Sequence, residues 1–409
     1  MPELTGTDAA MKERELIAAC ALSCVPGVGA STLSRVAQAL GSVEQALDAG
    51  CDALVANAEQ LQLAPRTRRF LRQRPDLWRL GEWALSAANA AGARVVLRSA
   101  PDYPDLLRRI DNAPAVLYVR GELAAQARRV AIVGSRAADG EALRVAREIA
   151  ERLACFGVEI VSGGARGIDA AAHAGALWGG GRTIAVLGCG VDVAYPPEHA
   201  DLFDGIASSG GAVVSEFPPG APSSRPNFPR RNRTIAGLSH ATVVVRAGLS
   251  SGALLTAASA LDQQRALFAV PGDPHDAIAV GPNQLIEAGA ATAVCNADEL
   301  LRLLDWSVAA RPATRADDGR SSGRPSVPMP LQLPLEPALE GPSRELWRAM
   351  QEGRPAHIDD LAARTNVPPH EALRWLTELE LKGLCRQAPG KYFLRCRAWP
   401  LNPNGSAGI

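Results

Sequence analysis

The chain has 409 residues, 47% of them hydrophobic, which is enough to bury at least two separate cores. Its 43 basic residues balance its 43 acidic residues, so the net charge alone does not indicate a polyanionic partner. The start of the chain lacks the pattern of a secretory signal, and no window approaches the roughly 20 apolar residues of a membrane span. These features predict a cytoplasmic protein that has no membrane partner.

The cysteines and histidines do not form a pattern typical of a metal site or a disulfide framework. Eight cysteines are scattered without a C-x-x-C pair, and the six histidines cluster neither with them nor with one another. Gly188 and Gly190 are not part of a dinucleotide fingerprint, because no G-x-G-x-x-G opens a helix there. We therefore expect reduced thiols, no metal and no cofactor.

Residues 1–92 are predicted to form a small helical domain. Apolar residues follow helical spacing from about Arg14 to Ala91, interrupted by the turn-like VPGVGAST and by Pro65 and Pro75. Residues 25–29, VPGVG, resemble the turn of a helix-hairpin-helix, in which backbone amides can hold a DNA phosphate. Because only one copy is present, packing within a helical bundle is an equally good interpretation.

Residues 93–306 are predicted to form a Rossmann-like, doubly wound α/β domain with a mostly parallel sheet. Short β-branched runs alternate with glycine-rich turns and alanine-rich helical segments. The runs are RVVL, RVAIVG, VEIVSG, TIAVLG, AVVSE, ATVVV and ALFAV. Sheets of this kind are covered by helices on both faces and bind ligands beyond the carboxyl ends of their strands.

The remainder of the chain divides into a linker and a third domain. Residues 307–341 are rich in proline, serine and arginine and have no apolar periodicity, which predicts a disordered linker. Residues 342–397 contain a helix, a second helix IDDLAART, a third helix HEALRWLTELELK and a hairpin around APGKYFL. This order is typical of a winged-helix module.

Four segments of the α/β domain are candidates to line an anion-binding crevice. The first is Gly134-Ser135-Arg136, which lies between the strand VAIV and a helix that begins near Gly140. Gly134 allows close approach of the backbone, while Ser135 and Arg136 offer donors to phosphate oxygens next to the N–H groups of a helix. A tight turn with a solvated arginine is the alternative interpretation.

The second segment, SGGARGIDAAAHAGAL, leaves a strand through glycines and carries Gly164, Arg166 and Gly167 ahead of a helix. Two such loops side by side would form a wider anion site. Asp169 would either benefit from the helix dipole or orient Arg166. An acid-base pair of Asp169 and His173 is disfavoured, because no nucleophile or third orienting group accompanies it.

The third segment, NFPRRNRTIAGLS, is predicted to be a basic turn that precedes a helix. Its candidate DNA contacts are Arg230, Arg231, Asn232 and Arg233. The surrounding stretch from Phe217 to Leu261 contains five arginines and no acidic residue, so its positive potential needs an outside partner. A solvated basic turn remains the alternative, and Phe228 either stacks on a base or packs beside Pro229.

The fourth segment, LSSGALLTAASA, places Ser251 and Gly252 where a helix opens. The strand ALFAV ends at Pro271-Gly272, and Asn283 lies where a further helix starts. All of these residues are candidates for the same crevice, although each signal is weak by itself.

In chain order, the GSR loop, SGGARGIDAAAH, RTIAVLGCGVDVAYPPEH, SEFPPG, FPRRNRTIAGLS, SGALLTA and AVPG resemble the DNA-processing protein A (DprA/Smf) family. The resemblance covers about Pro104 to Leu300. It implies a Rossmann-like domain that binds single-stranded DNA, forms a homodimer and helps to load the RecA recombinase during natural transformation, without being an enzyme. The helical and winged-helix domains are similar to accessory domains of many members.

Carried over residue by residue, the resemblance assigns the DNA pocket to residues 134–136, Arg166 and the arginines of FPRRNR. It adds Arg182, which matches a frequently basic position. Two departures affect the details of the pocket. Arg246 stands where many relatives have an acidic residue, and Gly281-Pro282-Asn283 replaces a Gly-Thr-Asn that often precedes Leu-Ile.

Two other functions compete with DNA binding by the central domain. Related Rossmann-like folds hydrolyse nucleotides at the N-glycosidic bond, but Pro271-Gly272-Asp273-Pro274 departs from the G-G-x-G-T-x-x-E loop of those enzymes. A sequence-specific regulator would bind through the third helix of the winged-helix module, which carries Glu371, Glu378 and Glu380. We therefore expect a DNA-binding mediator with little sequence preference rather than an enzyme or a regulator.

Overall fold

The computed structural model describes residues 6–306, 341–350, 356–365, 367–381, 385–388 and 392–395. The chain divides into two compact units, residues 1–314 and residues 315–409. Apart from Gly341, the linker predicted at 307–341 lies outside the described residues.

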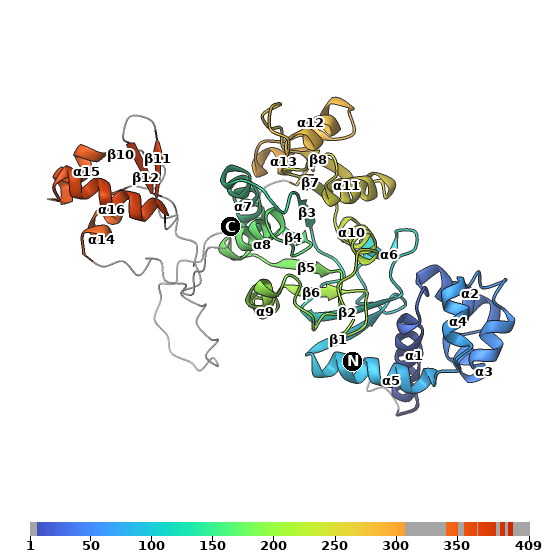
Figure 1. The fold of residues 1–409 in the computed structure, drawn as a ribbon. Coiled ribbons are helices and arrows are strands. Elements are labelled where there is room, and N and C mark those ends of the chain that lie inside the picture. The colour runs from blue at the N-terminus through green and yellow to red at the C-terminus, as the bar shows by residue number, and fades with distance from the viewer. Residues whose placement is uncertain are drawn as a thin grey trace, which may run out of the picture. The chain divides into compact units, whose positions relative to one another are not determined.

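The larger unit begins with a helical body (Figure 1). Its helices are α1 (Gly6–Cys24), α2 (Ala30–Leu40), α3 (Val43–Ala56), α4 (Pro65–Leu71) and α5 (Leu77–Ala90). Ser42 and Asp76 cap α3 and α5 by accepting hydrogen bonds from backbone amides, and Pro65 occupies the first turn of α4, where no N–H is needed. Leu22 and Leu54 belong to the apolar core that the helices share.

One sheet organises the rest of this unit. Its strands are β1 (Ala93–Leu97), β2 (Val116–Gly121), β3 (Arg129–Val133), β4 (Glu159–Ser162), β5 (Thr183–Leu187), β6 (Ala212–Ser215), β7 (Ala241–Val244), β8 (Ala266–Ala269) and β9 (Thr292–Ala293). They are ordered β1-β2-β6-β5-β4-β3-β7-β8-β9. Across the sheet, each pair of neighbouring strands from β6 through β5, β4, β3, β7 and β8 to β9 is parallel. The strand β2 is antiparallel to both of its neighbours, β1 and β6. The parallel part starts at β3, winds out to β6 and resumes at β7, so β3 and β7 flank the switch point of a doubly wound sheet.

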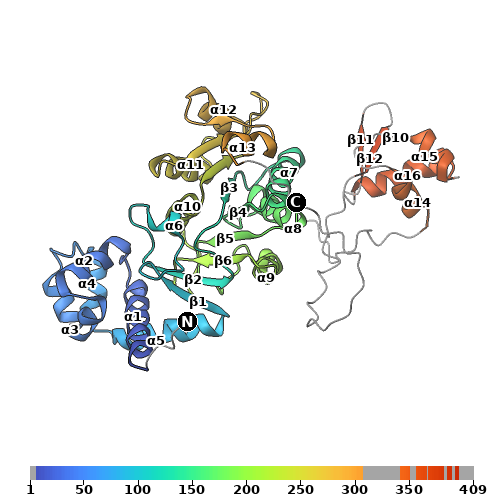
Figure 2. The same cartoon turned by 180° about the vertical axis from the view of Figure 1, so that it is seen from behind.

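Helices cover both faces of this sheet (Figures 1 and 2). They are α6 (Asp105–Arg108), α7 (Gly140–Cys155), α8 (Ile168–Trp178), α9 (Ala200–Ser208), α10 (Asn227–Leu238), α11 (Gly252–Asp262), α12 (Val280–Glu287) and α13 (Ala297–Leu303). Val133 and Val244 face α6, α10 and α11, while the preceding residues Ile132 and Val243 face α7, α8 and α13. Because successive strand residues point to opposite covered faces, these strands are hydrophobic throughout rather than alternating.

The smaller unit is a winged helix. Its elements are α14 (Pro342–Ala349), β10 (Ala356–His357), α15 (Ile358–Thr365), α16 (Pro369–Leu381), β11 (Cys385–Ala388) and β12 (Tyr392–Arg395). The strands form a sheet in the order β10-β12-β11. Trp347, Leu361, Leu376 and Phe393 are buried in its core.

These features confirm the predicted fold class, and all seven predicted runs are strands. The strands β2 and β9 are not among the predicted runs. The prediction that FPRRNR is a turn ahead of a helix is wrong, because α10 begins at Asn227 and includes the three arginines. Pro229 is tolerated there because the first four N–H groups of a helix have no intrahelical acceptor.

Candidate nucleic-acid interface

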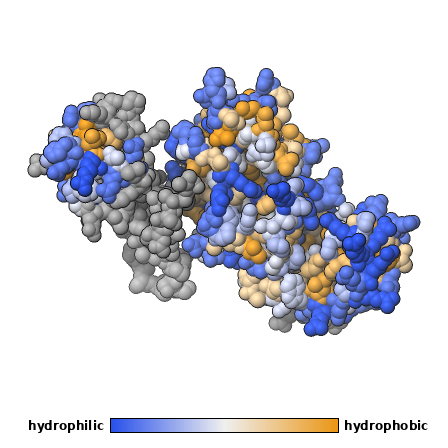
Figure 3. Space-filling model, in the orientation of Figure 1, coloured by the Kyte–Doolittle hydropathy of each residue, from blue (hydrophilic) through white to orange (hydrophobic). Residues whose placement is uncertain are grey.

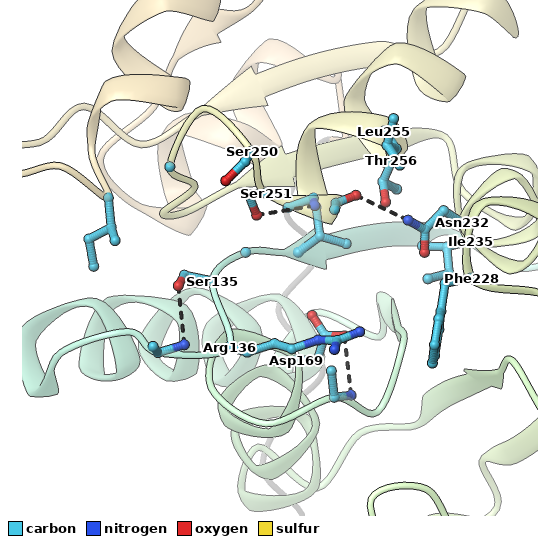
Figure 4. A pocket seen from close by; sticks show the side chains of 18 of the residues that line it. Ser135, Arg136, Asp169, Phe228, Asn232, Ile235, Ser250, Ser251, Leu255 and Thr256 are labelled. Carbon is cyan, nitrogen blue, oxygen red and sulfur yellow. Dashed lines mark hydrogen bonds between the residues drawn. The ribbon is translucent and has the colours of Figure 1, made fainter. Parts of the chain in front are cut away.

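A cavity of about 480 Å³ lies at the carboxyl ends of β3 and β7, where the winding of the sheet switches direction. Ser135 and Arg136 line one wall, Ser251 lies on the wall formed by α11, and Asn232 and Phe228 of α10 lie between them (Figure 4). A smaller cavity of about 110 Å³ shares Arg136, Ala165, Phe228 and Arg231 with the larger one. The structure therefore brings residues of all four predicted segments to one crevice, the second through Ala165 and Asp169.

Glycine is required where the loops after β3 and β4 meet. A Cβ atom at Gly134 would lie 2.6 Å from Ile168 and 2.8 Å from the carbonyl oxygen of Arg246. Gly167 has φ +76°, and a Cβ atom there would overlap the carbonyl of Ser135. The Ile168 N–H donates to that carbonyl (3.2 Å), and the Ser135 N–H donates to Arg246 O (2.6 Å). These glycines fix the position of the loop that carries Arg136.

Arg231 is buried, with 5% of its surface exposed, and lies against the carboxyl ends of β4 and β5. Its Nη1 donates to Val186 O (2.7 Å) and to Gly163 O, and its Nε donates to Asn232 Oδ1 (3.1 Å). Burial lowers the pKa of this guanidinium, an effect that the Asp169 carboxylate opposes. Arg231 thus supplies positive charge to the crevice while joining α10 to two strands.

Among the residues that the structure describes, Asp169 is the only carboxylate that lines the larger cavity. It accepts a hydrogen bond from the Ala165 N–H (3.3 Å), and a Cβ atom at Gly163 would lie 2.7 Å from its Oδ2 and would overlap Arg231 Nη1. Burial raises the pKa of Asp169, and the nearby Arg231 opposes that shift. Asp169 and Arg231 therefore form a buried, mutually compensating pair.

His173 does not reach the cavity. It is fully buried, and its Nδ1 lies 2.7 Å from Thr183 Oγ1, whose hydroxyl donates to Ile160 O. Since that hydroxyl is already a donor, Nδ1 is the protonated nitrogen of the imidazole. Burial lowers the pKa of His173 to about 3, so the ring is neutral near pH 7. This environment gives no support to the acid-base pair with Asp169.

Arg136 is exposed at the mouth of the crevice. Its guanidinium carbon lies 5.2 Å from the centroid of the Phe228 ring, and that of Arg231 lies 5.8 Å from the same ring. The Tyr195 ring, 40% exposed, has its centroid 5.9 Å from that of Phe228. Within residues 6–306, no carboxylate lies within ion-pair distance of Arg136. A free cation and two aromatic rings therefore lie together at the entrance.

The other predicted arginines of the second and third segments have partners in the structure. Arg166 lines the smaller cavity and forms an exposed ion pair with Glu198. Arg230 pairs with Glu216 at 3.1 Å, and its guanidinium lies 5.0 Å from the Phe217 ring. Arg233 Nη2 donates to Asp111 O at 2.6 Å. Neither Arg230 nor Arg233 lines a cavity.

The remaining polar and glycine positions mostly organise the walls. Asn232 Nδ2 donates to Gly252 O (3.0 Å), which ties α10 to the start of α11. Ser251 caps α11 by accepting a hydrogen bond from the Ala253 N–H (3.3 Å). Gly164 has φ +68°, and a Cβ atom there would lie 2.6 Å from the Phe203 ring, so it lines neither cavity.

Arg182 lies at the opposite edge of the sheet. It precedes β5, and its Nη2 is 2.6 Å from Oε1 of Glu159, the first residue of β4. Oε2 of the same carboxylate is 2.7 Å from Nε of Arg129, the first residue of β3. All of these groups lie at the amino ends of parallel strands, so the structure does not bring Arg182 to the crevice.

The two departures from the family pattern lie beside the crevice. Arg246 is 9% exposed, and its Nε is 3.9 Å from an oxygen of Asp276. Asn283 exchanges hydrogen bonds with Gly272, donating to its carbonyl (3.0 Å) and accepting from its N–H (3.1 Å). The loop after β8 is thereby held without the usual threonine.

Sequence reasoning missed Tyr195, Leu255 and Thr256. Leu255 and Thr256 line the larger cavity from α11, and Leu255 is 51% exposed. Tyr195 lines the smaller cavity from the loop that follows β5. Its position after a parallel strand was the available signal, since such loops reach the edge of the sheet where ligands bind.

The described residues contain no group of three or more histidine, cysteine or carboxylate side chains that could hold a metal ion. Among the described cysteines, Cys20, Cys24, Cys51, Cys155, Cys189 and Cys295 form no disulfide. None of the described helices is both long enough and apolar enough to span a membrane.

Two family models match successive parts of this chain. The family model for DNA recombination-mediator protein A matches residues 94–305, and that for the DprA winged helix domain matches residues 330–391. Protein Smf of Escherichia coli (strain K12) is 40% identical over 297 residues, which cover 72% of this chain and 76% of Smf. DNA processing protein DprA of Bacillus subtilis (strain 168) is 37% identical over 222 residues, covering 54% and 74%. The X-ray structure of DprA from Streptococcus pneumoniae is 30% identical and superposes with a TM-score of 0.58 over 74% of this chain and 98% of that one. The chain therefore belongs to the DprA/Smf family of DNA recombination-mediator proteins, and its role is in DNA processing.

Proposed function

We propose that the protein binds single-stranded DNA in the crevice at the carboxyl ends of β3 and β7. The observation that carries this proposal is the arrangement of Arg136, Phe228 and Tyr195 at the mouth of the cavity. A cation without a carboxylate partner suits a phosphate, and the exposed Tyr195 ring beside the half-buried Phe228 ring suits unpaired bases. Bases inside a duplex do not present their faces to such rings, so the arrangement favours single strands.

The size of the crevice supports the same ligand. A volume of about 480 Å³ lies in the range of sites that take small molecules, roughly 300–1,000 Å³. A nucleotide-sized group fits there, with its phosphate toward Arg136 and the hydroxyl of Ser135. Contacts of this kind carry little base-edge recognition, so we expect little sequence preference.

The test is fluorescence anisotropy of a short labelled oligo(dT) with the full-length protein. The double variant R136A/F228A should lose roughly ten- to a few hundredfold in affinity, because stacking contributes about 1–3 kcal/mol per base and a phosphate contact is lost as well. The matched control is R182A, an arginine at the other edge of the sheet, which should bind as the wild type does. Wild-type affinity of R136A/F228A, in a folded protein, would overturn the crevice assignment.

We further propose that the protein acts as a homodimer that loads RecA onto incoming DNA during natural transformation. Family membership supports this proposal, and two linked crevices on one strand would gain affinity through effective concentration. The protein should then accelerate RecA filament formation on strands coated with single-strand-binding protein. A monomer in analytical ultracentrifugation, with equal affinity for short and long strands, would remove the bridging dimer.

We also propose that the protein binds nucleotides without hydrolysing them. The carboxylate that lines the larger cavity, Asp169, is buried and engaged by Ala165 N–H and by the charge of Arg231, which leaves it poorly placed to act as a general acid. Chromatography of nucleoside monophosphates incubated with the protein should show no free base. Base release that disappears in D169N would instead establish the N-glycosidic hydrolase.

A further inference from the structure

The helical body carries a second cationic surface, far along the chain from the crevice segments. Residues 60–75 contain five arginines and no acidic residue, and residues 16–43 contain no acidic residue either. The carboxylates that flank these two stretches in sequence are Glu15, Glu44, Glu59 and Asp76. Figure 3 shows strongly hydrophilic residues gathered over α2 and α4.

Three of these arginines form a stripe without carboxylate partners. Arg66, Arg69 and Arg72 are exposed, and no carboxylate of the described residues lies within ion-pair distance of them. The other two arginines are engaged, since Arg68 Nε donates to Leu63 O (2.9 Å) and Arg74 pairs with Asp52 (2.8 Å). We name Arg66, Arg69 and Arg72 the α4 stripe.

The geometry of α4 holds the stripe on one side. At 3.6 residues per turn the three arginines span an arc of about 120°, and they extend roughly 9 Å along the axis. Thr67 and Leu71 are buried on the opposite side of the helix. The stripe therefore cannot turn inward to find partners without unpacking α4 from the core.

The hairpin between α1 and α2 is fixed beside the stripe. Thr67 Oγ1 donates to Pro26 O (2.7 Å), and Gly27 has φ +84°. A Cβ atom at Gly27 would lie 2.7 Å from Arg66 Nε. The turn that resembles a helix-hairpin-helix thus borders the α4 stripe, on a part of the surface that has no acidic residue in its own sequence.

We propose that the α4 stripe and this hairpin bind the phosphate backbone of duplex DNA. A duplex carries about one negative charge per 1.7 Å of its axis, so a stripe of roughly 9 Å meets several phosphates. Residues 16–43 and 60–75 include no exposed large hydrophobic side chain, and so no platform on which unpaired bases could stack. The surface therefore fits a backbone rather than a single strand, and it is independent of the proposed crevice function.

The experiment measures binding of full-length protein to a labelled 30-base-pair duplex and to a short oligo(dT) across a salt series. In R66Q/R69Q/R72Q, the slope of log affinity against log salt for the duplex should fall by about 2.7, at ~0.9 per phosphate contact. Affinity for the duplex at low salt should fall at least about tenfold, while affinity for oligo(dT) stays at the wild-type value. The control R144Q/R152Q/R302Q removes the same charge from exposed positions on α7 and α13 and should bind both ligands normally.

Two results would overturn the proposal. Duplex binding by the stripe variant that equals that of the wild type would exclude the stripe as the site. Displacement of the duplex from wild-type protein by excess short oligo(dT) would show that both ligands share one site. Failure of the crevice proposal looks different, because R136A/F228A would then bind oligo(dT) with wild-type affinity, whatever the stripe variant does to duplex binding.

Discussion

The two edges of the central sheet use arginine in opposite ways. At the amino edge, Arg129 and Arg182 share the carboxylate of Glu159, whose side chain is 5% exposed. At the carboxyl edge, Arg231 is held by backbone carbonyls and Arg136 lies against an aromatic ring. Positive charge is therefore compensated by a carboxylate at the amino edge, whereas Arg136 at the carboxyl edge is left available.

This difference explains why a chain with no net charge can present an anion site. At the carboxyl edge, Arg231 is balanced by Asp169, but Arg136 has a ring and no carboxylate beside it. Arg136 therefore keeps its full charge toward a ligand, whereas an arginine bound to a buried carboxylate does not. The local balance of carboxylates, rather than the count of arginines, separates binding sites from structural ones.

The largest expected effect comes from removing the buried arginine at the carboxyl edge. R231A leaves Asp169 buried without its countercharge and removes the donor to two strand carbonyls. We expect the free energy of unfolding of the larger unit to fall by about 3–5 kcal/mol, and single-strand binding to be lost as well. Urea unfolding followed by circular dichroism, with anisotropy under native conditions, measures both.

The corresponding change at the amino edge should separate stability from binding. E159Q leaves Arg129 buried without a countercharge, so a similar loss of about 3–5 kcal/mol is expected. The folded fraction should nevertheless bind oligo(dT) with wild-type affinity. Loss of binding in both variants, at equal folded fraction, would mean that the two edges are not functionally distinct.

The sequence was sufficient to predict the strands and the edge at which the site lies. Both follow from local patterns, namely β-branched runs and the loops after them. It was not sufficient to separate Arg136 from Arg182, because the pairing of Arg182 with Glu159 joins residues that are distant in the chain. In the same way, Arg233 is occupied by the carbonyl of Asp111, which no local pattern indicates.

The misassigned turn at FPRRNR has a different origin. A proline in the first turn of a helix costs no hydrogen bond, so Pro229 does not prevent α10 from starting at Asn227. Burial of Ile235 and Leu238 against the sheet then favours the helix from its first residue. The strand β9 was missed because it has only two residues, too few for a periodic pattern.

An intermediate effect is expected from pH, through the buried His173. Its pKa is lowered to about 3 from an ordinary value of 6.5, so the unfolded chain binds more protons between these values. The stability that neutral His173 contributes is therefore complete above pH 6.5 and is lost as the pH falls toward 3. At about 1.4 kcal/mol per pH unit, lowering the pH from 6.5 to 5 should cost about 2 kcal/mol.

The variant H173Q isolates this contribution. Asp169, whose pKa is raised by burial, acts with the opposite sign, and its contribution is present in both proteins. Unfolding free energies measured between pH 5 and 7 should therefore depend less steeply on pH in H173Q than in the wild type. The same slope in both proteins would show that His173 is not the group that titrates.

A smaller effect is expected from Arg136 alone. If it contacts one phosphate, R136A should lower the salt slope for oligo(dT) by about 0.7. R230A should change the slope less, because Arg230 is paired with Glu216 and lines neither cavity. A larger decrease with R230A than with R136A would move the path of the strand from the crevice to the outer face of α10.

The smallest effect is expected from deleting the winged-helix unit. All residues that line the two cavities lie between positions 133 and 278, so a protein ending at Trp306 keeps the whole crevice. The third helix of the deleted unit, α16, carries Glu371, Glu378 and Glu380, which oppose a phosphate backbone. Oligo(dT) affinity should therefore stay within about twofold of the full-length value, as one or two weak phosphate contacts would allow.

The deleted linker sequence contains Arg311, Arg315, Arg320 and Arg324, so any small loss should disappear as salt is raised. Complete loss of binding in the truncated, folded protein would show that the C-terminal unit, and not the carboxyl edge of the sheet, holds the strand.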